Sequence, residues 1–248
     1  MRIKLISCDV FLRPISAFVA TSPHIIDVEY VPMLAHNEPD KLRENLQSRI
    51  NAACSAQNYD LLLLSYGLCG NAALGLNCPI TMIMPRIHDC CAMFMGSKEK
   101  FIASFGNNLS MRWCTSGYYE RSYMDDGLTG HPSQSRETYR NNPEYRVLAE
   151  QFGEDNAEYI WETMHPEIET PEAAYIKIEG FEMPGCEGGF RKAVEAQGKT
   201  LRVIEGGTAY LRDMINGPWD NERFLEINPG EKIGAIYDME QVVKAVPV

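Results

Sequence analysis

The chain has 248 residues, of which 45% are hydrophobic, and a formal net charge of −11. That length and composition suit one α/β domain with a sizeable core. The negative charge opposes nonspecific attraction to nucleic-acid phosphates and to anionic lipids, so we expect neither nucleic acid nor a membrane as partner. No apolar run approaches the roughly 20 residues of a membrane helix, and charge interrupts the N-terminal run where a signal peptide is apolar. We therefore expect a cytoplasmic protein whose eight cysteines are thiols or ligands instead of structural disulfides.

Short apolar runs alternate with segments of helical spacing along most of the chain. In chain order they predict a strand at residues 3–7, a strand at 26–34, a helix at 40–54, a strand at 59–65, a short helix at 67–73, a strand at 79–84, a helix at 90–105, a strand at 109–116, a helix at 143–164, a strand at 173–178, a helix at 188–197, a strand at 200–204, a helix at 209–215 and a final hairpin or edge element at 233–237. Parallel strands need a right-handed crossover, which is usually helical. The alternation therefore predicts a largely parallel, doubly wound (Rossmann-like) α/β sheet with flanking helices, in one domain over residues 1–248.

One segment lacks periodicity. Residues 120–142 are polar and rich in Gly, Ser, Pro, Asp and Arg. They predict a long loop, and loops of this length in compact domains are often lids or binding loops, with disorder as the alternative.

Thiols and one imidazole follow three of the predicted strands. Cys8 follows the first strand and Cys69 follows the apolar run at residues 59–65. Cys90 follows the strand at residues 79–84, with His88 two residues before it. Because the carboxyl ends of parallel strands lie at one edge of a sheet, where ligands bind, we expect these side chains to converge in one crevice.

Three thiolates and an imidazole form a ligand set suited to zinc, so we expect Cys8, Cys69, His88 and Cys90 to hold a zinc ion. Asp89 can orient the His88 ring through its second nitrogen. The alternative is an iron–sulfur cluster, for which Cys91, Cys114 and Cys186 supply further thiols, although the compact C-x₂-C-x₂-C spacing is absent. Cys54 and Cys78 lie in apolar settings and are predicted to fill the core.

Other residues at the same predicted edge suit substrate chemistry. Cys69 can act as a metal ligand or, without metal, as a nucleophile at a helix N-terminus. Arg86 can hold an anionic substrate or form a salt bridge with Asp89. Glu205 is an acid–base candidate, together with Tyr118 and other residues of this edge.

Glycines follow several predicted strands. Gly67, Gly70 and Gly117 are positions where the backbone can approach a bound cofactor or turn tightly. Neither the G-x-G-x-x-G spacing nor a phosphate-binding P-loop motif occurs, so a nucleotide site is not supported.

The sequences YGLCGN at residues 66–71 and PRIHDC at residues 85–90 carry a resemblance. With them in view, nearly the whole chain resembles a prokaryotic family filed as a domain of unknown function, common in methanogenic archaea and anaerobic bacteria and often found near corrinoid-dependent methyltransferases. The pair His88 and Cys90 also resembles the zinc-binding element of methylcobamide:thiol methyltransferases, in which zinc activates a thiol to receive a methyl group.

These resemblances imply thiol, methyl-group or corrinoid-linked metabolism, with a small-molecule substrate or a corrinoid or methyltransferase partner. The D-x-H-x-x-G corrinoid-ligating motif is absent, so we do not expect His88 to bind a corrinoid. The leading hypothesis is a zinc-dependent transferase. The alternative is an iron–sulfur, metal-binding or corrinoid-binding accessory protein without turnover.

Overall fold

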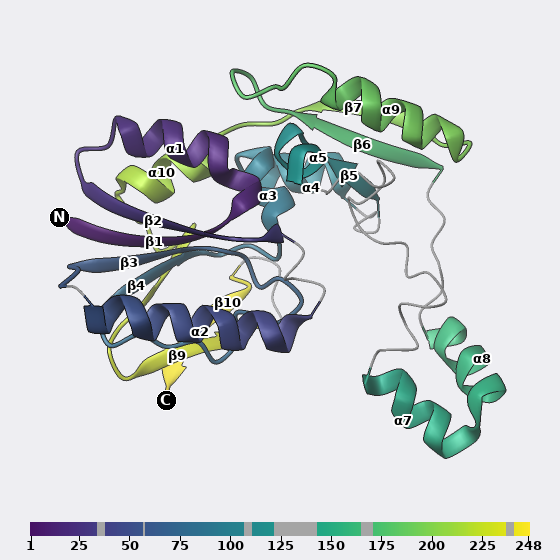
Figure 1. The fold of residues 1–248 in the computed structure, drawn as a ribbon, viewed down its shortest axis with the longest axis horizontal. Coiled ribbons are helices and arrows are strands. Elements are labelled where there is room, and N and C mark those ends of the chain that lie inside the picture. Colours follow the sequence, from purple (N-terminus) through teal and green to yellow (C-terminus); the bar gives the residue numbers. More distant parts are fainter. Residues whose placement is uncertain (34–37, 57, 107–110, 122–142, 165–170, 237–240) are drawn as a thin grey trace.

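The computed structural model describes residues 1–33, 38–56, 58–106, 111–121, 143–164, 171–236 and 241–248 (Figure 1). Its larger sheet has five strands in the order β2-β1-β3-β4-β8. Their bounds are β1 (Arg2–Cys8), β2 (Ile25–Val31), β3 (Leu61–Ser65), β4 (Met82–Pro85) and β8 (Phe224–Ile227). The first four strands are parallel, and β8 pairs antiparallel with β4. All five residues of β3 are buried, as expected for a central parallel strand that is covered on both faces.

Helices cover both faces of this sheet (Figure 1). α1 (Leu12–Ala20) and α10 (Ala209–Asn216) lie on one face, and α2 (Pro39–Ala56) lies on the other. The buried residues of α2 recur every three or four positions, which gives the helix one apolar face. The sequence analysis missed α1, because Pro14 stands inside it; a proline in the first turn of a helix removes no intrahelical hydrogen bond.

A second sheet contains three parallel strands in the order β5-β6-β7. They are β5 (Arg112–Cys114), β6 (Glu172–Lys177) and β7 (Thr200–Glu205), with α5 (Ser116–Arg121) after β5 and α9 (Cys186–Ala196) between β6 and β7. The doubly wound, largely parallel α/β architecture is therefore confirmed, but these three strands do not extend the first sheet. Most buried apolar residues of both sheets nevertheless belong to one hydrophobic cluster.

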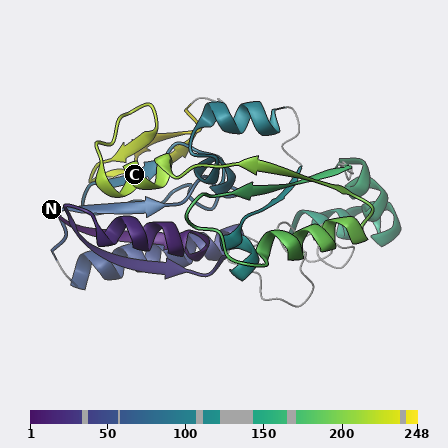
Figure 2. The same cartoon turned by 90° about the horizontal axis from the view of Figure 1, so that it is seen from above.

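The carboxyl ends of the two sheets face each other, and Figure 2 shows the sheets lying end to end. Short elements fill the junction: the 3-10 helix η1 (Asp9–Phe11) after β1, α3 (Cys90–Met95) after β4, and α5. In the loop that follows β7, the amide of Gly207 donates to the carbonyl of Phe94 in α3 at 2.8 Å. A side chain at Gly117 in α5 would meet the carbonyl oxygen of Val10 in η1 at 2.2 Å, so this junction needs glycine there.

Several predicted helices are interrupted. The segment 90–105 is divided into α3 and α4 (Lys98–Phe105), because Gly96 adopts a left-handed conformation and Ser97 caps α4 by accepting from the amide of Lys100. The segment 143–164 is divided at Gly153 into α7 (Pro143–Phe152) and α8 (Glu154–Met164). These two helices form a hairpin with its own small core and lie apart from the sheets in Figure 1.

The last two strands form a hairpin near the C-terminus. β9 (Glu231–Ala235) pairs antiparallel with β10 (Val243–Pro247), so the predicted final hairpin exists but includes a later strand than expected. Residues 120 and 121 belong to α5, while the rest of the predicted lid, residues 122–142, lies outside the described residues. Among the described residues, no helix has the length and apolar character needed to cross a bilayer.

Candidate functional site

The strand order places a topological switch point between β1 and β3. From β1 the chain crosses to β2 on one side, and it then returns to β3 on the other side of β1. Ligands of open α/β sheets bind outside the carboxyl ends of the strands at such a point. Cys8 is the last residue of β1, and Tyr66 directly follows β3, so both stand at the switch point.

The loop after β3 lies against the loop after β4. The amide of Leu68 donates to the carbonyl of Ile87 at 3.0 Å, and the amide of Cys69 donates to the carbonyl of His88 at 2.9 Å. A side chain at Gly67 would come within 2.9 Å of three backbone atoms in residues 87–89, so only glycine permits this approach. The same two loops therefore carry Cys69 and His88.

The predicted short helix at residues 67–73 is wrong, because consecutive residues adopt positive φ. The φ angles are 47° at Cys69, 62° at Gly70 and 70° at Asn71, and left-handed residues cannot continue a right-handed helix. Such a conformation is uncommon for a cysteine and stores strain that recurs at functional sites. Cys69 consequently lacks the helix N-terminus that would lower the pKa of a nucleophilic thiol.

Three thiols meet at this edge. Burial raises the pKa of Cys8 to about 12. Burial and then the charge of Cys8 raise the pKa of Cys69 to about 12. The pKa of Cys90 lies well above its usual value because of burial, of Asp89 and of the charges on Cys69 and Cys8. Burial is the largest cause in all three cases, so without a cation Cys8, Cys69 and Cys90 are neutral thiols near pH 7.

Tyrosines from both sheets border the thiols. The Tyr118 hydroxyl, on α5 after β5, lies 2.6 Å from the Cys90 sulfur. Its ring packs edge-on against Trp113, with centroids 4.5 Å apart. Tyr66 comes from the other sheet, and burial followed by the charges of Cys8 and Cys69 raises its pKa well above the usual value. Tyr118 thus contacts Cys90, and Tyr66 contacts Cys8.

Buried polar atoms without a hydrogen-bond partner gather at the same strand ends. They are Oδ1 of Asp9, Oγ of Ser65, the hydroxyl of Tyr66 and Nε2 of His88. Buried polar atoms are nearly always satisfied in native proteins, so each of these needs a partner such as a water, an ion or a ligand. Four such atoms lie at the ends of three adjacent strands, so this edge offers polar groups to a water, an ion or a ligand.

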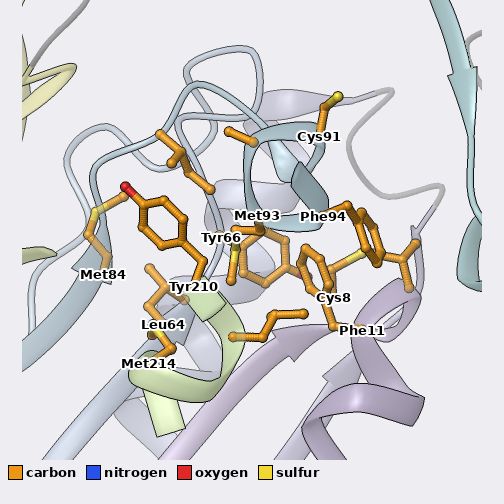
Figure 3. Packing of buried hydrophobic residues seen from close by; sticks show 14 of the residues in the cluster. Cys8, Phe11, Leu64, Tyr66, Met84, Cys91, Met93, Phe94, Tyr210 and Met214 are labelled. Carbon is orange, nitrogen blue, oxygen red and sulfur yellow. The ribbon is translucent and has the colours of Figure 1, made fainter. Parts of the chain in front are cut away.

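The neighbouring residues Asp89 and Cys91 have structural roles. The Asp89 carboxylate caps α3 by accepting from the amide of Cys91 at 2.9 Å, a contact that the sequence did not predict. Figure 3 shows Cys91 pointing away from Cys8 and Tyr66, on the other side of α3. Adjacent residues of a helix point about 100° apart, which separates Cys91 from Cys90.

Other predicted site residues lie elsewhere. The Arg86 guanidinium donates to backbone carbonyls of Asn221 and Val243, so these donors hold the C-terminal segment. Glu205 is exposed at the end of β7 in the second sheet. Cys114 is buried at the end of β5 and Cys186 is buried at the start of α9, and neither has an electrostatic interaction with Cys8, Cys69 or Cys90 among those found for the two thiols.

The sequence analysis missed Tyr66, Asp9 and Ser65 as parts of this edge. A signal for two of them existed, since a polar serine and a tyrosine end an otherwise unbroken leucine strand. Among the described residues, no group of three or more His, Cys, Asp or Glu is already arranged to hold a metal ion. In the described part of the chain, Cys8, Cys69 and Cys90 share one sheet edge but do not form a coordination sphere.

A family model matches residues 30–215 of the chain and carries the description DUF1638, a protein of unknown function. The chain belongs to the DUF1638 family. The matched range includes Cys69, His88 and Cys90, whereas Cys8 precedes it. No match was found among curated proteins or among solved structures. Membership of DUF1638 confirms the resemblance to a family of unknown function and supplies no reaction, so the chemistry must be argued from the site.

Proposed function

We propose that this protein binds a zinc ion through Cys8, Cys69 and Cys90 and uses it in a cytoplasmic transfer reaction on a thiol. The single observation that supports this most is the meeting of three thiols from three strand ends at the topological switch point. Cysteines brought together from distant parts of a sequence are the usual soft ligands of zinc.

The raised pKa values of the three thiols argue against a nucleophilic role in the metal-free protein. A neutral buried thiol is a poor nucleophile, since the thiolate is the reactive form. A bound divalent cation supplies the positive charge that stabilises neighbouring thiolates, so the thiols lose their protons when the cation binds. Because the thiols are not already placed around one point, side-chain rotation accompanies binding.

His88 is our candidate for the fourth ligand. Its Nε2 is buried without a hydrogen-bond partner, and its backbone carbonyl accepts from the amide of Cys69, so the two residues belong to one pair of loops. A neutral imidazole nitrogen is a good zinc ligand. If His88 stays free, the fourth position is open to a substrate, as catalytic zinc sites require.

Zinc with an open position activates a bound thiol by holding it as thiolate at neutral pH. In the reaction that we propose, this thiolate sulfur forms a bond to a methyl carbon, and the electron pair of the broken bond leaves with the methyl donor. The methyl donor is a small molecule or a corrinoid carried by a partner protein. The net charge of −11 disfavours nucleic acid as partner.

Elemental analysis of protein purified without oxygen tests the metal. We expect one zinc per chain in the wild type and in Cys54→Ser, a matched control because Cys54 is also a partly exposed cysteine but lies outside the cluster. We expect loss of zinc in Cys69→Ser with an unchanged far-UV circular dichroism spectrum.

Three outcomes contradict the proposal. Iron with acid-labile sulfide identifies an iron–sulfur protein, and absence of metal after anaerobic reconstitution overturns the metal site altogether. Zinc in the wild type that binds no small thiol indicates a structural or carrier site and overturns the transferase.

A further inference from the structure

Two cysteines outside the clustered thiols lie side by side. The sulfur atoms of Cys54 and Cys78 are 3.6 Å apart, and neither residue is in a disulfide. Cys54 is in the last turn of α2 and is partly exposed, while Cys78 is buried in the segment that leads to β4. The sequence analysis assigned both to the core and did not place them together.

The backbones that carry these cysteines are held in place by a side-chain clamp. The Gln47 amide nitrogen donates to the carbonyl of Asn77 at 3.0 Å, and the Gln47 amide oxygen accepts from the amide of Asn77 at 3.1 Å. Gln47 lies two helical turns before Cys54 on the same side of α2, and Asn77 directly precedes Cys78. On the other side, the carbonyl of Leu76 accepts from the amide of Ile233 in β9 at 2.9 Å.

We propose that Cys54 and Cys78 are a redox-active dithiol that a peroxide converts into an intramolecular disulfide. The partly exposed Cys54 attacks first, as thiolate, and breaks the O–O bond, which gives a sulfenic acid and one water. The Cys78 sulfur then bonds to the Cys54 sulfur and expels the hydroxyl as a second water. The two thiols lose two electrons and two hydrogens to one peroxide, so the reaction balances.

The order of attack follows from the surroundings. Burial raises the pKa of Cys78, so this thiol stays protonated until its neighbour has been oxidised. The clamp keeps the second thiol in contact range, and reactions between groups held in contact gain a large effective concentration. The two sulfurs, 3.6 Å apart, have to approach to about 2.05 Å to form a disulfide.

The disulfide would close a loop around part of the candidate zinc site. The enclosed segment, residues 54–78, contains β3, Tyr66 and Cys69. Oxidation therefore restricts the loop that carries Cys69 without altering Cys69 itself. This proposal does not depend on zinc binding, because it rests on the contact between two other sulfurs.

The test uses the reduced full-length protein. It is treated with one equivalent of hydrogen peroxide, blocked with N-ethylmaleimide, digested and analysed by mass spectrometry. We expect a peptide pair joined through Cys54 and Cys78, two hydrogens lighter than the reduced pair, as the first product. Gln47→Ala keeps both thiols but removes the clamp, and it should slow the joining by about ten-fold.

Control variants separate this pair from the other cysteines. Cys91→Ala removes a buried thiol elsewhere and should leave the joined peptide unchanged. In Cys54→Ala, Cys78 should stay a free thiol after peroxide treatment and carry only the N-ethylmaleimide label. A first disulfide between other cysteines, oxidation of Cys54 to sulfinic acid without joining, or no reaction at Cys54 in the wild type would each overturn the proposal.

Discussion

Replacing Gly67 by alanine tests the packing that carries the site. The new methyl group would meet the amide nitrogen of residue 89 and the carbonyl oxygens of residues 88 and 87, each at 2.9 Å. These are backbone atoms, so the two loops have to separate. The two hydrogen bonds that join the loops, at 3.0 and 2.9 Å, are weakened together.

The magnitude follows from these contacts. Two lost hydrogen bonds cost about 0.5–1.5 kcal/mol each, and overpacking adds about 1–3 kcal/mol. We expect Gly67→Ala to lower the free energy of unfolding by about 3 kcal/mol, which for a chain of this size lowers Tm by about 6–12 °C. Zinc content should fall as well, because the displaced loop carries Cys69.

In a matched control variant, we expect the stability to change in the opposite direction. Gly188 lies within α9, and a side chain there meets nothing within 4 Å. Gly188→Ala should therefore raise the stability by about 0.5–1 kcal/mol. Thermal unfolding followed by circular dichroism measures both variants. A Tm of Gly67→Ala equal to that of the wild type or of Gly188→Ala would refute the close approach of the two loops.

Three other predictions concern stability alone. Asp89→Ala removes the cap of α3 and should cost about 1 kcal/mol in urea unfolding, with rescue by Asp89→Asn. Arg86→Met leaves backbone carbonyls of the C-terminal segment unpaired and should cost about 1–3 kcal/mol, whereas an unchanged urea midpoint would argue against this role. Burial acts to raise the pKa values of Asp213 and Asp220, but hydrogen bonds outweigh it and lower both; they come from Arg212 and Arg223 to Asp213 and from Arg223 to Asp220. The ion pairs therefore stabilise the fold above the unfolded pKa of about 4 and lose that effect as the pH falls through the lower folded values; Arg223→Met should flatten the decline of Tm below pH 4.

Much of the fold was predictable from local patterns. The leucine run of β3 and the periodic apolar face of α2 specify their structures through burial, which sequence patterns report directly. Sheet membership was not predictable, because β5, β6 and β7 have the same composition whether they extend one sheet or form another. The helix breaks at Gly96 and Gly153 depend on left-handed residues, and a single glycine within an apolar period signals such a break only weakly.

The candidate site was partly predictable for a related reason. Strand ends share one edge of a parallel sheet, so the placement of Cys8, Cys69 and Cys90 after the adjacent strands β1, β3 and β4 followed from topology. The contact of Tyr118 with Cys90 did not, because it joins two sheets whose relative position no local pattern reports. Arg86 lies near the site in sequence, but its guanidinium points to the backbone carbonyls of Asn221 and Val243, far along the chain.

The meeting of the two sheets also gives the protein an optical reporter. Trp113 is buried in β5 and packs edge-on against Tyr118, whose hydroxyl touches the sulfur of Cys90. Any event that removes the proton from that sulfur or places a metal on it alters the electric field along this line of three side chains. The indole of Trp113, one of three tryptophans in the chain, is therefore placed to report a change at the Cys90 sulfur through its fluorescence.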